Sequence, residues 1–259
     1  MLSNDLVLRG YTVAQESGGL GEQALSKVAE MGLESQLDES DNLDVNVKTD
    51  PLKVIQGQVD SVSIKGEGLV MKKDLRVEEM EMKTGSIAIN PLSAAFGKIE
   101  LTEPTQASAR VVLTEEDLNR ASNSEYIHGK LQNMTVEVEG RTVTIDVQQV
   151  NLHLLADGKI TLNADILQRG TGDVQKVAFT ATPRVSPDKQ HVSLDDIQYA
   201  EGQSLPPELN TALLNKAHEL LNLSKFSLQG MSLKIQTMEI TEGSLTLQTE
   251  ALITEFPSA

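Results

Sequence analysis

Val77-Glu-Glu-Met80-Glu-Met82-Lys-Thr-Gly85 is the stretch that decides the fold, because it alternates like a strand and breaks that alternation once. Its two consecutive glutamates would move the following apolar residues to the wrong face of a sheet unless one extra residue is absorbed as a bulge. Bulges bend a sheet and increase its twist. We therefore predict a bulged strand that runs into a glycine turn.

The same break recurs along the chain. Clear copies cover residues 194–202 and 235–243, and looser copies cover residues 59–68 and 147–158. The intervals between them are irregular, which excludes a fixed-period solenoid or propeller. The copies instead predict a sheet whose strands share one bending device.

Helical patterns interrupt the strand patterns at a few places. We predict an amphipathic helix over residues 20–37, a helical turn over 92–97, a short capped helix from Thr114 to Ala121, and the strongest helix over 204–223. Most other segments alternate as strands, including 54–64, 99–113, 131–199 and 226–253. The order predicts an α+β chain with a dominant antiparallel sheet. We expect a polar N-terminal segment at residues 1–19 and a single domain at 20–256, with room for two similar lobes.

Composition excludes several functional classes. The 259 residues include 38 acidic and 22 basic residues, a formal net charge of −16, with 3% aromatic residues and no tryptophan. This charge repels nucleic acid and anionic surfaces, so we expect no nucleic-acid partner. The absence of cysteine excludes disulfides and thiolate chemistry. The core must be aliphatic.

No motif for catalysis stands out. The four histidines are far apart in sequence, and the residues of an acidic pair such as Glu78-Glu79 point to opposite faces of a strand. Phosphate-binding loops and nucleophile elbows are absent from the sequence. We therefore expect no enzyme, no metal and no cofactor. An enzyme acting on a lipid or glycan stays open only if distant carboxylates converge in the fold.

The methionines suggest a flexible apolar surface. Met80 and Met82 share a strand face, and other methionines occupy apolar positions of strand patterns: Met71, Met134, Met231 and Met238. Methionine is flexible and polarizable, so such a surface can accept chains of varying shape. The alternative is that these residues fill gaps in a twisted core.

A small basic cluster departs from the acidic average. Lys65, Lys72, Lys73 and Arg76 lie within twelve residues of one another. Lysine and arginine offer charge-assisted donors, so Lys72, Lys73 and Arg76 are candidates for binding a phosphate head group. The alternative is an ordinary solvated hairpin tip.

From about residue 21 to residue 256 the chain resembles the LmeA-like phospholipid-binding family, within the tubular lipid-binding superfamily. The resemblance is carried by Ile55-Gln-Gly-Gln-Val-Asp-Ser-Val-Ser-Ile64, Gly68-Leu-Val-Met71, Asp74-Leu-Arg76, Ile87-Ala-Ile-Asn-Pro-Leu92, Leu113-Thr-Glu-Glu-Asp-Leu-Asn119, Phe226-Ser-Leu-Gln-Gly-Met231 and Gly243-Ser-Leu-Thr-Leu247. It implies a long, highly twisted and bulged antiparallel sheet wrapped around amphipathic helices, forming an apolar tube or groove for acyl chains.

The residues and the resemblance together give candidates for an apolar lipid-binding groove. These are Met71, Met80, Met82, Phe96, Ile145, Phe179, Leu213, Leu214, Leu220, Phe226, Met231 and Met238. The segment 92–96 is a candidate apolar rim for membrane contact, with an ordinary buried turn as its alternative.

We therefore expect a lipid-binding or lipid-transfer protein whose partner is a phospholipid or another acyl lipid and whose membrane contact is transient. The alternative is a non-catalytic protein-interaction scaffold at a membrane surface. The first twenty residues lack the basic start and apolar core of a secretory signal. The expected location is therefore the cytoplasm, including the cytoplasmic face of a plasma or thylakoid membrane, since the form resembles cyanobacterial members. The sequence leaves the oligomeric state open.

Overall fold

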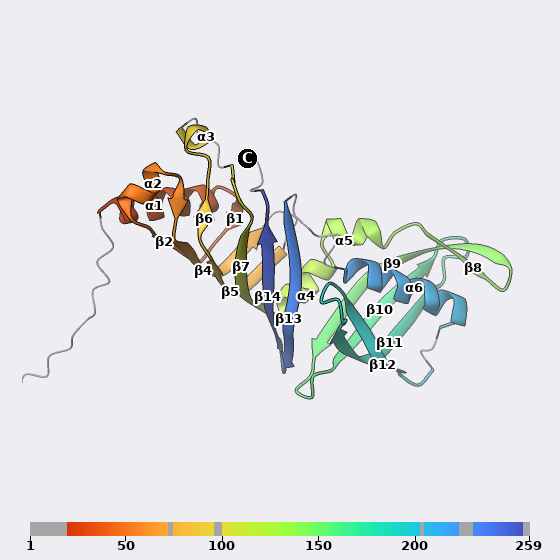
Figure 1. The fold of residues 1–259 in the computed structure, drawn as a ribbon. Coiled ribbons are helices and arrows are strands. Elements are labelled where there is room, and N and C mark those ends of the chain that lie inside the picture. The colour runs from red at the N-terminus through yellow and green to blue at the C-terminus, as the bar shows by residue number, and fades with distance from the viewer. Residues whose placement is uncertain (1–19, 72–74, 96–99, 203–204, 223–229, 256–259) are drawn as a thin grey trace, which may run out of the picture.

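Antiparallel strands dominate the computed structural model, which describes residues 20–71, 75–95, 100–202, 205–222 and 230–255. Within these ranges the strands form a seven-stranded sheet, a five-stranded sheet and a two-stranded sheet (Figure 1). The predicted dominance of antiparallel strands is confirmed. The expected single long sheet is instead divided.

The seven-stranded sheet curls into a half-barrel (Figure 1). Its order is β1–β4–β5–β7–β14–β13, and β2 also pairs with β4. The strands are β1 (Leu37–Glu39), β2 (Asn42–Lys48), β4 (Ser61–Met71), β5 (Leu75–Thr84), β7 (Thr105–Thr114), β13 (Met231–Thr241) and β14 (Ser244–Ile253). The last two strands return from the end of the chain to complete this sheet beside β7.

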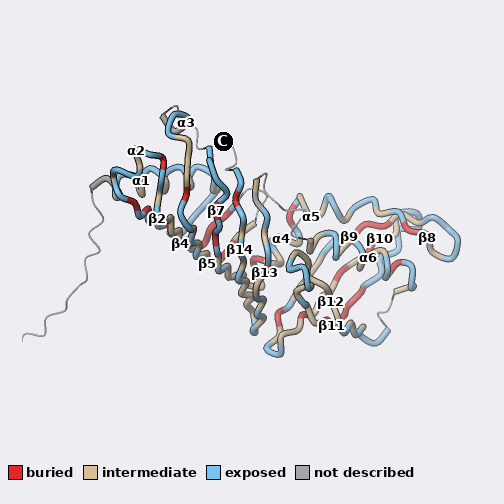
Figure 2. Tube along the Cα trace, viewed as in Figure 1, coloured by how far each residue is buried: buried red, intermediate tan, exposed pale blue. Residues whose placement is uncertain are grey.

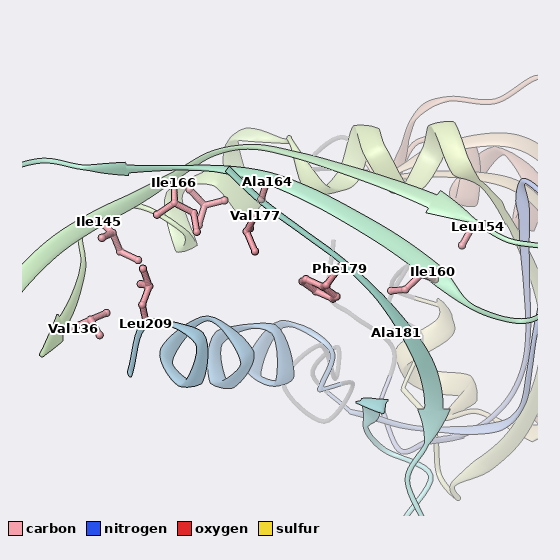
Figure 3. Packing of buried hydrophobic residues seen from close by; sticks show 11 residues of the cluster. Val136, Ile145, Leu154, Ile160, Ala164, Ile166, Val177, Phe179, Ala181 and Leu209 are labelled. Atoms are coloured by element: carbon pink, nitrogen blue, oxygen red, sulfur yellow. The ribbon is translucent and has the colours of Figure 1, made fainter. Parts of the chain in front are cut away.

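The five-stranded sheet is covered on one face by helix α6 (Pro207–Leu220). Its order is β12–β11–β10–β9–β8. The strands are β8 (Met134–Val138), β9 (Arg141–Leu154), β10 (Ile160–Gln168), β11 (Val174–Val185) and β12 (Val192–Tyr199). Figure 3 shows Leu209 of α6 pointing at Ile145 and Val136, so this sheet and its helix share one core.

The two-stranded sheet pairs β3 (Gln58–Val59) with β6 (Ile87–Ala88), next to the short helices α2 (Pro51–Ile55) and α3 (Pro91–Ala95). The predicted helical turn at 92–97 is confirmed by α3 over its described part. The prediction of a strand from residue 54 is wrong at its start, where α2 forms instead. The Asp50 carboxylate caps this helix by accepting from the Leu52 amide, and a proline fits its first turn.

Three of the five predicted slips are bulges in the structure. The pairing register shifts by one residue because an extra residue is accommodated within β9 at 147–149, within β12 at 195–198 and within β13 at 235–237. These shifts confirm the copies at 147–158, 194–202 and 235–243.

The other two predicted bulges are wrong. In the copy at 77–85, β5 pairs with β4 without a register shift. The alternation of side chains between the two faces is broken in both strands at the same place. Gly68, with φ of +57°, lies there opposite Glu78. Leu69 and Val77 are therefore both buried in the core that Met80 contacts. The copy at 59–68 crosses the boundary between β3 and β4 instead of lying within one strand.

Helix α1 (Leu20–Glu34) protects an edge of the seven-stranded sheet. The Ser26 hydroxyl accepts from the Val47 amide of β2 at 2.9 Å, and the Glu22 carboxylate accepts from the Thr49 amide at 2.9 Å. Its Leu25 packs against the core under β2 and β4. The predicted amphipathic helix is thus confirmed, and it satisfies backbone groups that would otherwise form an open edge.

Helix α4 (Glu115–Ser122) joins the two large sheets. Thr114 caps this helix as predicted, and the Asp117 side chain completes a capping box with it. The Asn119 amide side chain donates to the Leu152 carbonyl at 2.8 Å and accepts from the Leu152 amide at 2.7 Å, and Asn123 pairs with Val150 in the same way. These side chains substitute for a neighbouring strand along β9, where β8 does not reach. The following helix α5 (Glu125–Lys130), capped by Ser124, was not predicted.

Candidate functional site

One face of the seven-stranded sheet is a continuous aliphatic surface. Its side chains lie in rows across β4, β5, β7, β14 and β13, because the register places them opposite one another. One row is Ile64, Met82, Ala109, Thr249 and Ile235, and the next is Gly66, Met80, Val111, Leu247 and Met238. We call these two rows the aliphatic face. Both methionines of β5 and Met238 of β13 lie on it.

Much of the aliphatic face is only partly covered. Ile235 is 1% exposed, but Met80, Met82, Val111 and Met238 are half-buried. Figure 2 shows buried segments interleaved with intermediate and exposed ones along these strands. A sheet core in a close-packed protein would bury such side chains fully.

The opposite face of the same sheet is polar. A shallow hollow of about 280 Å³ lies there. Most of its lining is polar, from Glu81, Lys83, Ser108, Arg110, Gln236, Gln248 and Glu250, and two residues of the aliphatic rows, Ala109 and Thr249, also border it. Its charged lining suits water and gives no apolar site for an acyl chain. The aliphatic face is therefore the better candidate.

The aliphatic face is continuous with the cores at both sides. Near β2, Val111 and Met80 pack against the core that α1 also covers. Toward the second sheet, Ile240 and Leu245 pack against the core under α6. Leu245 is paired in register with Leu113 of β7, so aliphatic side chains connect the two cores without a polar break.

Several apolar side chains of the five-stranded sheet are fully buried, unlike most of those on the aliphatic face. Ile145 is 2% exposed and Phe179 is 9% exposed, and both pack in the core where Leu213 of α6 also lies. The rings of Phe179 and Tyr199 pack edge to face, with their centroids 5.8 Å apart. Burial raises the pKa of Tyr199, although its hydroxyl donates to Asn210 of α6. Two of the predicted groove residues are thus packed core residues.

The remaining groove candidates lie in varied places. Leu214 and Leu220 are half-buried on α6, and Met71 is 38% exposed at the end of β4. Phe96, Phe226, Lys72 and Lys73 lie outside the described residues, as does the side chain of Met231.

Arg76, a predicted head-group ligand, binds carboxylates of its own chain. Its guanidinium donates to Asp117 at 2.7 Å and to Glu78 at 2.7 Å, and lies 3.9 Å from Asp41. Asp117 is 1% exposed. Burial alone would raise the pKa of Asp117, but hydrogen bonds from the Thr114 amide and from Arg76 outweigh it and hold that pKa below its usual range. These contacts join β5 to α4 and occupy the group that a phosphate would need.

Sequence reasoning missed how α4 holds β9. Glu115, Asn119 and Asn123 are four residues apart, so they form one stripe of the helix. The Glu115 carboxylate accepts from the Leu154 amide at 2.9 Å and contacts His153. The Leu154 amide, burial and His153 together set the pKa of Glu115, and the net effect lowers it. The regular polar spacing was the available signal.

The predicted rim at 92–96 is exposed where it is described. Leu92 is 75% exposed, which is inconsistent with the alternative of a buried turn at that residue. Leu52 and Ile55 of the neighbouring α2 are 70% and 75% exposed. Neither was predicted as a surface residue: Ile55 lay in the segment taken for a strand, and Leu52 lay just before it.

Other site classes find no support in the part of the chain that the structure describes. There, no three histidine, aspartate or glutamate side chains gather to hold a metal ion. No helix within those ranges has the length and hydrophobicity needed to cross a membrane.

Comparison with known proteins identifies a family. A family model described as LmeA-like phospholipid-binding matches residues 17–250. No curated protein matches the chain. The family match confirms the resemblance drawn from the sequence motifs.

Proposed function

The chain belongs to the LmeA-like phospholipid-binding family, and on that premise we propose that it holds phospholipid acyl chains against the aliphatic face of its seven-stranded sheet. The observation that carries this proposal is the pair of aliphatic rows whose Met80, Met82 and Met238 are only partly buried. Covering such partly exposed apolar side chains with another apolar group lowers the free energy, because it removes apolar surface from water.

The energetics favour an acyl chain as that group. Each buried methylene contributes about 0.8 kcal/mol, so a partly seated chain binds without specific polar contacts. Methionine side chains adjust to chains of different shape. A surface of this kind fits lipids as a class better than one particular lipid.

We further propose that the protein transfers lipid between membranes or partners. The half-exposed face is open enough for an acyl chain to enter and leave without unfolding a closed cavity. The net charge of −16 disfavours lasting attachment to an anionic membrane, so contact with a bilayer is transient. Transfer requires this combination of apolar binding and weak membrane attachment.

Lipid uptake tests the proposal. The purified protein is incubated with phosphatidylcholine vesicles, separated from them, and examined by native mass spectrometry for bound lipid. We expect a lipid-bound species for the natural sequence and its loss in Met80→Glu with Met82→Glu, because two carboxylates on the aliphatic face oppose acyl chains.

A matched control places two carboxylates on the polar face of the same sheet. Ser108 and Gln248 are exposed there, so Ser108→Glu with Gln248→Glu adds the same charge and should leave uptake intact. A protein that stays empty from purification through incubation contradicts the proposal. Stable protein partners without extractable lipid would support a scaffold in its place.

A further inference from the structure

Helices α2 and α3 form a tip at one end of the curled sheet, where β5 ends and β7 begins (Figure 1). Three large apolar side chains of this tip are exposed: Leu52 at 70%, Ile55 at 75% and Leu92 at 75%. Single exposed apolar residues are common on protein surfaces. Gly57, just after α2, lies against Pro91 of α3, so the two helices of five residues each adjoin. Three exposed apolar side chains on such a short stretch are a concentration that usually marks a contact surface.

The tip is built to hold these side chains in place. The amide of Ile89 donates to the Gly57 carbonyl at 2.7 Å, and Asn90 caps α3 by accepting from the Leu92 amide at 3.1 Å. Gly57 has φ of +74°, and a Cβ there would lie 2.1 Å from the Ile89 oxygen. The two helices therefore approach closely through a glycine that no other residue can replace without strain.

The tip adjoins the end of the aliphatic face. Ile87 of β6 is 6% exposed and Ile253 at the end of β14 is 3% exposed. Thr105, which pairs with Ile253, donates its hydroxyl hydrogen to the Ser86 carbonyl at 2.9 Å. This hydrogen bond links the segment that leads into β6 and the tip with β7, one of the strands that carry the aliphatic face.

The charges around the tip indicate what can cover it. Asp50 caps α2, Lys53 pairs with Asp60 at 2.6 Å, and Glu100 accepts from Ser93 at 2.6 Å. Three of these four charged groups are acidic, and the single base is paired. An anionic surface or an acidic peptide is not attracted to such a tip, whereas the apolar layer of an uncharged bilayer suits the three exposed side chains.

We infer that the α2–α3 tip inserts Leu52, Ile55 and Leu92 into a bilayer of low charge and that phospholipid passes there between the bilayer and the aliphatic face. This inference rests on the proposed function. It goes further by naming the docking surface and by assigning its attraction to apolar insertion instead of charge. Binding to vesicles should therefore be as strong on pure phosphatidylcholine as on mixtures with phosphatidylserine, and should persist in high salt.

Two measurements test the inference. The first is flotation of the protein with phosphatidylcholine vesicles. The second is binding of dihexanoyl phosphatidylcholine below its micelle concentration, a monomeric lipid that needs no bilayer. Replacing Leu52, Ile55 and Leu92 together by serine should weaken flotation on the order of a thousandfold, because each inserted side chain contributes roughly a factor of ten. Binding of the monomeric lipid should be unchanged.

A single-site comparison controls for the loss of any exposed apolar residue. Val174 is 50% exposed on β11 in the other sheet. Ile55→Ser should weaken flotation about tenfold, and Val174→Ser should leave it unchanged.

The possible outcomes separate this inference from the proposed function. Unchanged flotation of the triple variant overturns the inference while monomeric lipid binding preserves the proposed function. If the natural sequence does not bind the monomeric lipid, both the inference and the proposed function are overturned. The tip could instead join two copies of the chain. If the natural sequence is a dimer that does not bind vesicles, and the triple variant is a monomer, the inference is also overturned.

Discussion

The two large sheets present similar aliphatic faces but cover them to different extents. Under α6, Ile145 and Ile166 are each 2% exposed and Ala181 is fully buried. On the seven-stranded sheet, Met80 and Met82 stay half-buried, with α1 at one edge and α4 near the junction. Helix α6 covers the five-stranded sheet, whereas the seven-stranded sheet keeps apolar surface available for a ligand.

The side chains differ in the same direction. The covered sheet uses Ile, Val and Phe, which are stiff and fill a defined space. The open face concentrates methionine at Met80, Met82 and Met238, which adapts to a changing neighbour. This contrast predicts that equivalent truncations act on stability in one sheet and on lipid binding in the other.

The largest expected effect is in the covered sheet. Phe179→Ala should lower the free energy of unfolding by about 3–5 kcal/mol, because it leaves a cavity beneath α6. Met238→Ala on the open face should cost only roughly 1 kcal/mol, since its side chain is already half-exposed. Chemical denaturation measures both. Equal losses would remove the distinction between the two sheets.

The next effect tests the connection between the sheets. Asp117→Asn should cost roughly 3 kcal/mol, because it removes a buried charge that binds Arg76 and the Thr114 amide. Glu78→Gln is the control, since Glu78 contacts the same guanidinium from an exposed position and should cost under about 1 kcal/mol. The finding that Glu78→Gln costs as much as Asp117→Asn would contradict the assigned role of Asp117.

A smaller effect is expected where α4 replaces a strand beside β9. Asn119→Ala should lower the free energy of unfolding by about 2 kcal/mol, because it leaves both the amide and the carbonyl of Leu152 without this partner. Amide hydrogen exchange at Leu152 should quicken, while exchange in β11 should stay slow. Unchanged exchange at Leu152 would show that α4 does not hold this edge.

The smallest effect is a change with pH. The pKa of Asp117 is lowered in the folded protein, so its stabilisation is complete above the unfolded pKa of about 4 and is lost as pH falls through the folded value. The difference in unfolding free energy between the natural sequence and Asp117→Asn should therefore narrow in acid. Denaturation curves at a series of pH values measure this, and a widening difference would contradict the assigned pKa direction.

Local signals predicted the local structure well. The capping box at Thr114, the apolar spacing of α1 and α6, and three of the bulges were readable because each depends on a few neighbouring residues. Helix α2 was missed because its last residues, Val54 and Ile55, were taken as the start of a strand and the cap at Asp50 was not recognised.

Long-range pairing could not be predicted in the same way. The division into two sheets depends on β14 pairing with β7, and Thr249 and Ala109 are 140 residues apart in sequence. The candidate groove list therefore mixed Phe179, which α6 covers, with Met82, which it does not. Both look alike in a strand pattern, and only the fold decides which face receives a helix.

The most direct test of the central claim is where a bound acyl chain lies. A phospholipid with a diazirine in its acyl chain is loaded, irradiated, and the labelled peptides are identified by mass spectrometry. We expect label on peptides of β5 and β13, which carry Met80, Met82 and Met238. Label confined to α6 and to β11, whose Phe179 packs in the core with α6, would contradict the account.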